Sequence, residues 1–332
     1  MALKSWFLIL ILAALPAFAG SEQPFNPGDV VSTSCGFSAL YRRGSVSPSW
    51  LGKVLSPPAP TTGPLTYSPA LNRMILGAYT FAKRDADGHV RAPYATLETL
   101  DTDGRLAPLL TLPDYARVTA LAGVGREILA VVVLSVPSIH IELWRIAATE
   151  GRAAEQIGLP LPPTGLPIYD ITSIDLAGDG CTLAYAVPGE VIHRYDICAR
   201  RPLDDAATRT ASAVHFLPQG DLLVSESLVP GAKPWTRLAR YDREGRLVSA
   251  AGFALRGSIT AIALDPDGST AWIVTNSSVF GCVVGGGELM AVNVSSGALI
   301  AGPWQFGGQG VAVAGEWRAA DQPPARGRAV RQ

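Results

Sequence analysis

The chain has 332 residues, a formal net charge of −1 and a charged fraction of only 17%. A near-neutral chain offers no electrostatic basis for binding nucleic acid or an anionic membrane surface, so we expect no nucleic-acid partner. The 34 glycines and 26 prolines predict many short elements joined by tight turns, which disfavours a helical bundle.

The N-terminus has the three parts of a secretory signal peptide. Lys4 supplies a positive charge, residues 6–15 form an unbroken apolar run, and residues 17–19 (Ala-Phe-Ala) place small side chains before a cleavage site. About ten apolar residues are too few to cross a bilayer, which needs roughly 20. We therefore expect residues 1–19 to be a signal peptide cleaved after Ala19. The mature protein is then secreted or periplasmic, with no membrane span after cleavage. The alternative is an uncleaved N-terminal anchor.

The repeating pattern in the rest of the chain is a pair of short aliphatic strands joined by a tight turn. In the clearest copy, ITAIALDPDGSTAWIVTN, we expect strands over 259–264 and 271–275 and a turn at 265–268. Proline presets φ for such a turn, and glycine tolerates a positive φ. Similar pairs recur about every 50 residues, with turn anchors at Asn72, Gly125, Gly180, Gly220 and Gly268.

A second pair of strands follows each of these pairs, as in LETLDTDGRLAPLL (97–110), LARYDREGRLVSA (238–250) and LMAVNVSSGALIAG (289–302). Residues 145–158 belong to a looser copy. We expect them to be an irregular outer connection rather than a helix, because Gly151 interrupts them. Four strands in about 48 residues are typical of a β-propeller blade. The sequence therefore predicts an all-β fold of four-stranded antiparallel blades.

The number of repeats predicts a six-bladed propeller. Five copies are complete, whereas residues 28–56 lack a first strand and residues 309–317 supply one strand with nothing after it. Together these fragments make a sixth blade whose inner strand comes from the C-terminus, which closes the ring and removes free sheet edges. Counting the N-terminal segment separately gives the alternative of seven blades. We expect the propeller domain to span 20–318 and the Pro- and Arg-bearing tail, 319–332, to be disordered.

Four cysteines in an exported chain favour disulfide bonds over free thiols or a metal site. A two-residue hairpin loop at 189–190 sets Cys181 directly opposite Cys198 in a non-hydrogen-bonded pair, with Cα atoms about 4.5 Å apart. That distance permits a disulfide. Cys35 and Cys282 then remain, in the first and last blades. We expect them to bridge the seam of the ring, with two separately buried thiols as the alternative.

Motifs of known catalytic chemistry are missing from the sequence, which has no G-x-S-x-G, H-E-x-x-H, P-loop or C-x-x-C-H pattern. We identify no catalytic residue and no set of metal ligands. Candidate binding residues follow from topology alone, because propellers bind ligands at a mouth of the central channel, in loops that precede inner strands or join middle strands. This criterion selects Tyr169, Asp170, Asn276 and Glu316. His215 belongs to an inner strand and is a further candidate to face the channel.

Two stretches resemble known repeat families. LDPDGSTAWIVTN (264–276), followed by LMAVNVSSGALI, is similar to repeats of the YVTN and NHL propellers. GDGCTLAYAVPGEVIHRYDICA (178–199) resembles a blade of exported bacterial propellers grouped with the SMP-30/gluconolactonase/LRE-like families. The resemblance implies that enzymes of that group hold a divalent metal with a channel-lining Glu, an Asn and an Asn-Asp pair. This sequence has no Asn-Asp dipeptide and lacks the usual Glu-Gly-Pro start, which argues against lactonase activity.

Two functions of different classes follow from these observations. The favoured one is a non-enzymatic, monomeric exported propeller, a scaffold that binds a protein or small-molecule ligand on one face, and for it the sequence identifies no cofactor. The alternative is a metal-dependent hydrolase or lactonase of the SMP-30/gluconolactonase type with a divergent site. It would use Ca²⁺, Mg²⁺ or Zn²⁺ and would need at least three oxygen or nitrogen ligands at the channel, with one coordination position left for water.

Overall fold

The fold is all-β, as predicted. The computed structural model describes residues 24–34, 37–51, 61–80, 82–84, 87, 90–160, 171–227, 236–253, 257–276 and 287–321. Within these ranges the chain forms β-strands and one 3₁₀ helix, η1 (Ala319–Asp321), and no α-helix. Among the same residues, no helix is long and apolar enough to cross a membrane.

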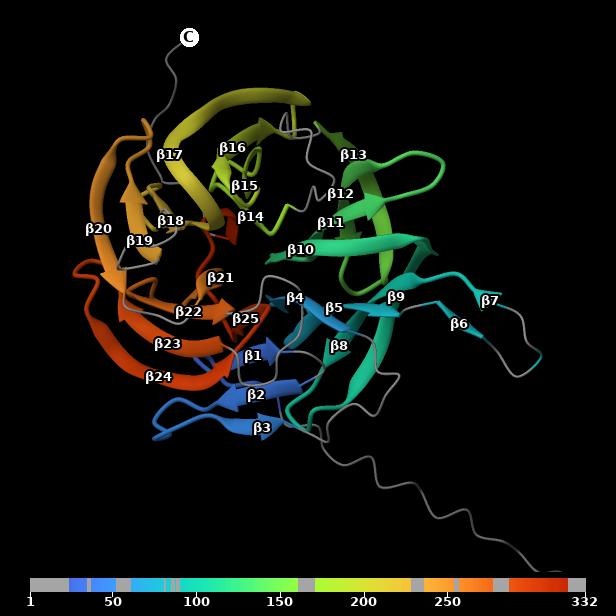
Figure 1. Ribbon diagram of the computed structural model, residues 1–332, viewed down its shortest axis with the longest axis horizontal. Helices are drawn as coiled ribbons and strands as arrows, with labels where there is room; N and C mark the ends of the chain where they lie inside the picture. Colours follow the sequence, from blue (N-terminus) through green and yellow to red (C-terminus); the bar gives the residue numbers. More distant parts are fainter. Residues whose placement is uncertain are drawn as a thin grey trace, which may run out of the picture.

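Four four-stranded sheets and one seven-stranded sheet stand around a common centre, which is the arrangement of a β-propeller (Figure 1). All neighbouring strands are antiparallel. Three of the four-stranded sheets follow chain order from the centre outward. They are β4 (Thr61–Ser68), β5 (Arg73–Thr80), β8 (Tyr94–Leu100) and β9 (Leu106–Asp114); β10 (Ala116–Val124), β11 (Glu127–Leu134), β12 (His140–Ala147) and β13 (Arg152–Leu159); and β21 (Ser258–Leu264), β22 (Thr270–Asn276), β23 (Gly287–Asn293) and β24 (Leu299–Gly307).

The seven-stranded sheet is held together by one long strand, β17, which has 16 residues and curves from the rim toward the centre (Figure 1). The order of the sheet is β14 (Ser173–Leu176), β15 (Thr182–Ala186), β16 (Glu190–Asp196), β17 (Arg201–Phe216), β18 (Leu222–Ser227), β19 (Thr236–Tyr241) and β20 (Leu247–Phe253). A separate two-stranded ribbon, β6 (Lys83–Arg84) with β7 (Val90–Arg91), extends from the connection between β5 and β8.

The remaining four-stranded sheet joins the two ends of the chain. Its order is β25 (Gly310–Val313), β1 (Val30–Ser34), β2 (Phe37–Tyr41) and β3 (Ser49–Leu51). β25 pairs antiparallel with β1, with Val30 opposite Val313. The C-terminal strand is therefore the innermost strand of the sheet that the N-terminus forms, as the incomplete repeats predict.

The turn anchors of the repeats have the backbone conformation that their residue types predict. All five have positive φ, at 50° for Asn72, 54° for Gly125, 68° for Gly180, 84° for Gly220 and 70° for Gly268. Such φ values are readily adopted by glycine and, among other residues, mainly by asparagine. The anchors mark the turns between the first and second strands of successive repeats.

Hydrophobic clusters fill the spaces between neighbouring groups of strands. Six such clusters exist among the described residues. One of them contains Val131 of β11 and Tyr185 of β15. Another lies within the seven-stranded sheet and contains Ile192 of β16 and Val224 of β18, so the two halves of that sheet pack on each other as separate sheets do. The core is thus divided among the spaces around the ring.

Residues 145–158 are more regular than predicted. They form the end of β12, a turn and most of β13, and Gly151 has a φ of 59° in that turn. Gly151 disfavours a helix, as expected, and its positive φ also suits the sharp reversal between two strands. The segment is a hairpin instead of an irregular connection.

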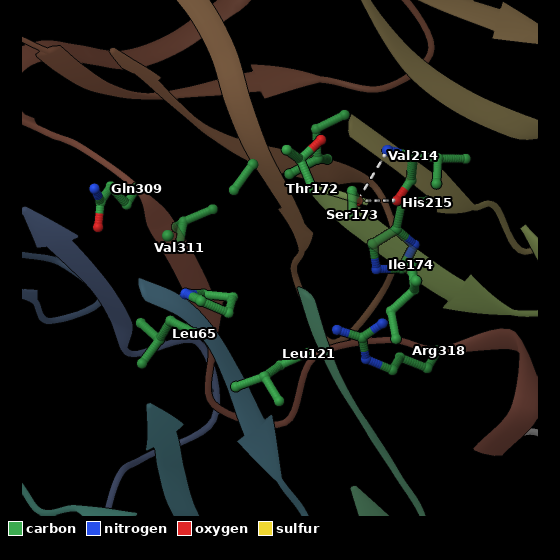
Figure 2. Close-up of a pocket in the computed structure, with 14 residues that line it drawn as sticks. Leu65, Leu121, Thr172, Ser173, Ile174, Val214, His215, Gln309, Val311 and Arg318 are labelled. Carbon is green, nitrogen blue, oxygen red and sulfur yellow. Dashed lines mark hydrogen bonds between the residues drawn. The ribbon is translucent and has the colours of Figure 1, made fainter. Parts of the chain in front are cut away.

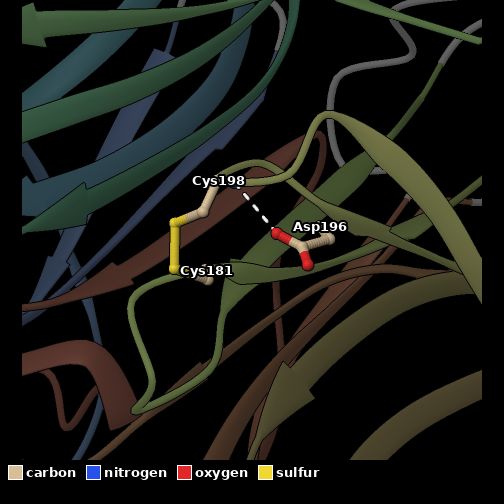
Figure 3. Close-up of side chains that lie close together, drawn as sticks. All are labelled: Cys181, Asp196 and Cys198. Atoms are coloured by element: carbon tan, nitrogen blue, oxygen red, sulfur yellow. Dashed lines mark hydrogen bonds between the residues drawn. A yellow bond between two sulfur atoms is a disulfide. The ribbon is translucent and has the colours of Figure 1, made fainter.

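The predicted Cys181–Cys198 disulfide is present (Figure 3), and the Cα atoms are 5.3 Å apart. The predicted register, however, is wrong by one residue, because β15 and β16 pair Thr182 with Asp196. The two cysteines therefore lie just outside the paired residues and are not directly opposite. Cys35 and Cys282 lie outside the described residues.

The register differs because the hairpin uses another turn. Glu190 N donates to Val187 O at 3.0 Å, and Gly189 has a φ of 88°. Pro188 and Gly189 therefore take the two central positions, where a type II turn favours proline first and glycine second. The prediction had placed Gly189 and Glu190 at these positions. The turn at 188–189 alone would move every pair by two residues, but Glu190 is an extra residue between the turn and the part of β16 that pairs with β15, where Ala186 is opposite Ile192, so the net shift is one residue.

Candidate functional site

The inner strands surround a narrow central cavity (Figure 2), which is about 30 Å³ in volume. A cavity of this size holds about one or two water molecules. Its lining comes from β4, β10, β14, β17, β21 and β25, from residues just before β14 and β25, and from the segment after β25: Pro64, Leu65, Leu121, Thr172, Ser173, Ile174, Val214, His215, Ala261, Ile262, Gln309, Gly310, Val311 and Arg318. This small volume suits ordered water better than an organic ligand in the described part of the channel.

Hydroxyl groups tie neighbouring inner segments to one another around this cavity. Thr172 Oγ1 donates to Ser212 O at 2.8 Å, and Ser212 Oγ is 2.7 Å from Ile259 O. Thr260 Oγ1 continues the series with a 2.7 Å bond to Gly308 O. These short side chains give hydrogen bonds to backbone carbonyl groups of the neighbouring inner segments. Their role is to fasten the inner strands, which leaves them committed to the backbone.

A closed ring of four buried charged side chains lies at one end of the cavity, and we call it the charge ring. It consists of Asp175 in β14, His215 in β17, and Glu316 and Arg318 beyond β25. Arg318 donates from Nη1 to Asp175 Oδ1 and from Nη2 to Glu316 Oε2, both at 2.7 Å. His215 completes the ring, with Nδ1 3.0 Å from Asp175 Oδ2 and Nε2 3.1 Å from Glu316 Oε1.

The charge ring is electrically neutral when His215 is protonated. Burial alone lowers the pKa of His215, but the carboxylates of Asp175 and Glu316 outweigh burial and raise this pKa above its usual value. The same two carboxylates raise the pKa of Arg318 against the effect of burial. Two cations and two anions then balance, so the charges stabilise one another and attract little from outside.

Backbone donors hold the carboxylates in place. Asp175 accepts from Leu176 N at 2.9 Å and from Phe216 N at 2.8 Å. Glu316 accepts from Leu264 N at 3.3 Å. The charge ring therefore connects the ends of β14, β17 and β21 with the C-terminal segment. It joins strands that are far apart in the chain.

The two ends of the inner strands define two faces of the propeller. We call the leading face the one where inner strands begin, at Ala116 of β10, Ser173 of β14 and Ser258 of β21, and the trailing face the one where they end. The charge ring lies at the trailing face, because Glu316 bonds to Leu264, the last residue of β21.

The segment after β25 crosses the trailing face and covers the charge ring. A Cβ atom on Gly268 would lie 3.5 Å from the Trp317 ring, and one on Gly178 would lie 3.0 Å from Ala319 O. Ala319 is buried in η1, so residues 319–321 are folded and not part of a disordered tail as predicted. Their order follows from packing on the turns of the trailing face. Residues 322–332 lie outside the described residues.

The predicted site residues are only partly brought together. His215 of β17 lines the cavity and contacts Glu316. Asn276 pairs with Ser258 at the start of β21, whereas Glu316 bonds at the end of that strand, so they lie on opposite faces. Tyr169 and Asp170 are outside the described residues. The prediction that all loop candidates lie at one mouth of the channel is therefore wrong for Glu316.

Asp175 and Arg318 were missed by the sequence analysis. Asp175 does carry a local signal, since it is a charged residue within the aliphatic stretch ITSIDLAG of an inner strand. A buried carboxylate needs a charged or hydrogen-bonding partner, and this requirement could have singled it out. Arg318 follows Glu316 by two residues, but no local pattern relates either residue to Asp175, which is 143 positions away.

One group among the described residues brings three side chains of metal-binding type close together, namely Cys181, Asp196 and Cys198 (Figure 3). The two sulfur atoms are bonded to each other, so neither is a thiolate that can bind a metal. Asp196 Oδ1 accepts from Cys198 N at 3.0 Å and serves the turn. This group is structural in the disulfide form of the protein.

Comparisons with known proteins identify the fold and no family. No family model matches the chain, and no curated protein matches it. A solved structure titled "Crystal structure of Nidogen/Laminin Complex" is similar, with a TM-score of 0.54 and 12% sequence identity over 86% of this chain and 98% of that chain. At this identity the similarity concerns the fold alone.

Proposed function

We propose that this protein is an exported β-propeller that binds a protein partner on its leading face and has no catalytic site. The observation that carries the proposal is a group of exposed apolar side chains on two adjacent loops of that face. Tyr115, Val136 and Ile139 are 46%, 59% and 51% exposed. Tyr115 precedes β10 and the other two lie between β11 and β12, and the loops adjoin because Ala116 pairs with Leu134.

Exposed side chains of this kind support protein recognition. Exposed apolar groups that gather at one place are common at protein interfaces, and tyrosine is enriched among residues that dominate binding energy. Asn276 ends β22 at the leading face, and Tyr169 and Asp170 precede β14 in sequence. Asn276, the one loop candidate described at this face, therefore fits a partner that lies across it.

The features of the central channel favour binding of a partner on the surface of the propeller over binding inside the channel. The cavity holds about one or two water molecules, and the charged groups at its end are already paired with one another. A hydrolase of the SMP-30/gluconolactonase type would need carboxylates free to bind a divalent cation. In this protein, Asp175 and Glu316 are instead paired with Arg318 and His215. No observation favours the hydrolase over the scaffold.

The similar solved structure also supports a binding scaffold. Its title describes a complex of two proteins, nidogen and laminin. We extend from that title only the idea that a propeller of this kind can serve as a protein-binding module. Export of the chain is supported by the signal-like N-terminus and by the Cys181–Cys198 bond, since disulfides persist in oxidising compartments.

We further propose that the ring has six blades of the kind found in YVTN, NHL and SMP-30/gluconolactonase/LRE-like repeats. β17 would serve as the outer strand of one blade and the inner strand of the next, which divides the seven-stranded sheet into two blades. Six hydrophobic clusters support this count, because a closed ring has as many interfaces as blades.

Site-specific photo-crosslinking tests the binding function. A photoreactive amino acid at Ile139 should give a defined adduct with another protein in the native compartment. The matched position is Glu244, which is 66% exposed in the turn between β19 and β20 on the trailing face and should give none. Binding of the purified adduct partner should weaken at least about tenfold when Tyr115, Val136 and Ile139 are replaced together by serine.

Three outcomes would contradict the proposal. They are the absence of an adduct at Ile139, an equal adduct at Glu244, or unchanged affinity of the triple variant. Lactone hydrolysis by the purified protein that depends on added Ca²⁺, Mg²⁺ or Zn²⁺ would overturn the non-enzymatic part and restore the hydrolase.

A further inference from the structure

The outer strands of the propeller differ in how well they resist pairing with another chain. An exposed outer strand presents unpaired backbone groups, and proteins usually protect such strands by short length, charge, proline or a bulge. Most outer strands here have such protection: β3 has three residues, β9 contains Pro108 and Pro113, β13 contains Arg152 and Glu155, and β24 contains Pro303.

The outermost strand of the seven-stranded sheet, β20, lacks charge and proline. Its sequence is LVSAAGF, and among the described strands none pairs with its outer side. Leu247 and Val248 are 50% and 52% exposed. One irregularity of register lies at these two residues, but Ser249 to Phe253 pair regularly with β19. Five consecutive residues therefore offer a regular, uncharged edge.

Exposed apolar side chains flank this edge on the next sheet. The turn before β24 lies against β20, because a Cβ atom on Gly297 would come within 2.3 Å of Ala251 Cβ. Leu299 and Ile300 follow that turn at the start of β24 and are 50% and 54% exposed. Edge and flank together form one surface, which we call the β20 edge, made of Leu247 to Gly252 with Leu299 and Ile300.

We propose that the β20 edge pairs with the same edge of a second copy of this chain, to form a two-fold symmetric dimer with a continuous antiparallel sheet. In a two-fold symmetric contact the strand pairs with a copy of itself. A charged side chain in the strand can then lie close to the same charge on the other copy and be repelled by it. β20 has no charged residue, so self-pairing brings no such repulsion. The small side chains of Ser249, Ala250 and Gly252 also let two strands approach closely.

This dimer goes beyond the proposed partner-binding function and does not depend on it. The β20 edge is on the outer rim, whereas Tyr115, Val136 and Ile139 lie on the leading face beside β10 and β11. It also revises the monomer expected from sequence. One strand pair with four flanking aliphatic side chains per protomer is a small interface, so we expect a reversible dimer whose population depends on concentration.

Sedimentation velocity of the mature protein tests the proposal. Between about 1 and about 100 µM, the wild-type protein should shift from monomer toward dimer. Ala250→Lys and Ser249→Lys each place two lysines close together across the pair and should weaken dimerisation at least about tenfold. Gln156→Lys is the matched control, because it adds the same charge to an exposed position of another outer strand, β13, and should leave the dimer unchanged.

The outcomes separate this inference from the partner-binding function. A wild-type protein that stays monomeric over this range overturns the dimer and leaves adduct formation at Ile139 untouched. A dimer that persists in both lysine variants, or that Gln156→Lys disrupts equally, overturns the assignment to the β20 edge. Circular dichroism of each variant establishes that it is folded, and two independent lysine positions guard against a local folding defect.

Discussion

Replacement of Arg318 by methionine should strongly destabilise the protein. The guanidinium of Arg318 is shared by two buried carboxylates, at 2.7 Å from Asp175 and 2.7 Å from Glu316. Methionine keeps much of the aliphatic part of the side chain and has no charge, so two buried carboxylates would be left with His215 as their one cation within the charge ring. Removing one member of a buried ion pair typically costs about 3 to 5 kcal/mol. We expect a loss of that size in the free energy of unfolding.

Urea unfolding, followed by tryptophan fluorescence, measures this loss, because the chain has seven tryptophans and Trp317 lies beside the charge ring. Arg246→Met is the control. Arg246 also pairs with a carboxylate, Asp242, but is 76% exposed, so its replacement should cause no measurable change. The comparison isolates burial, because both variants lose an arginine–carboxylate pair.

A double variant tests whether charge balance is the cause. Glu316→Gln combined with Arg318→Met leaves Asp175 and His215 as one anion and one cation. The double variant should therefore be less destabilised than the sum of the two single variants. Additive losses, or a loss below about 1 kcal/mol for Arg318→Met alone, would show that mutual neutralisation in the charge ring does not stabilise the fold.

Three other predictions concern His215 of the charge ring, the disulfide and the packing of the inner strands. The folded-state pKa of His215 is raised, so its stabilising effect should be complete below its unfolded pKa of about 6.5 and be lost as pH rises through the folded value; a stability difference between wild type and His215→Gln that does not change with pH would contradict this. Replacing Cys181 and Cys198 by serine should lower stability by about 3 kcal/mol, and dithiothreitol should lower that of the wild type equally but leave the variant unchanged. Gly123→Ala should destabilise by about 3 kcal/mol or more, because its Cβ would lie 1.9 Å from a carbonyl oxygen of β4, whereas Gly158→Ala has no atom within 4 Å and should have little effect; equal thermal midpoints for the two alanine variants would refute the packing argument.

Features that depend on a few adjacent residues were predictable from the sequence. The five turn anchors were chosen as residues that tolerate positive φ, and each has it. The strands around Gly268 were expected over 259–264 and 271–275, and they span Ser258–Leu264 and Thr270–Asn276. A strand and its turn are encoded locally, since alternation and turn propensity act over a few residues. Ring closure was also predictable, because an incomplete repeat at each end can be counted.

Hairpin register was less predictable, since two turn types compete for the same residues. Gly189 suits the first central position of a type II′ turn and the second of a type II turn. Pro188 decides between them in the structure, because it occupies the position before Gly189 that a type II turn favours. The disulfide was still predicted correctly, since a shift of one residue keeps the two Cα atoms at 5.3 Å, within bonding range.

The charge ring could not be predicted from the sequence, because its four residues meet only after the propeller has closed. The expected propeller topology selected His215 and Glu316 as candidates but placed Glu316 with loops of the other face. Asp175 is joined to Arg318 across 143 positions, and no spacing rule relates residues that different strands bring to a common axis. Long-range contacts of this kind depend on the complete topology and not on neighbours in the chain.

The C-terminal segment combines the two features that complete this fold. β25 supplies the innermost strand of the N-terminal sheet, and Glu316 and Arg318 follow within five residues of its end. The four charges of the charge ring come together only when this segment is seated, because the segment supplies both Glu316 and Arg318. Ring closure and burial of charge are therefore coupled: a chain whose C-terminal strand is displaced also leaves Asp175 and His215 without Arg318 and Glu316. Buried charges seldom add stability by themselves, but here they make the seating of the C-terminal segment a condition for pairing the charges at the ends of β14, β17 and β21.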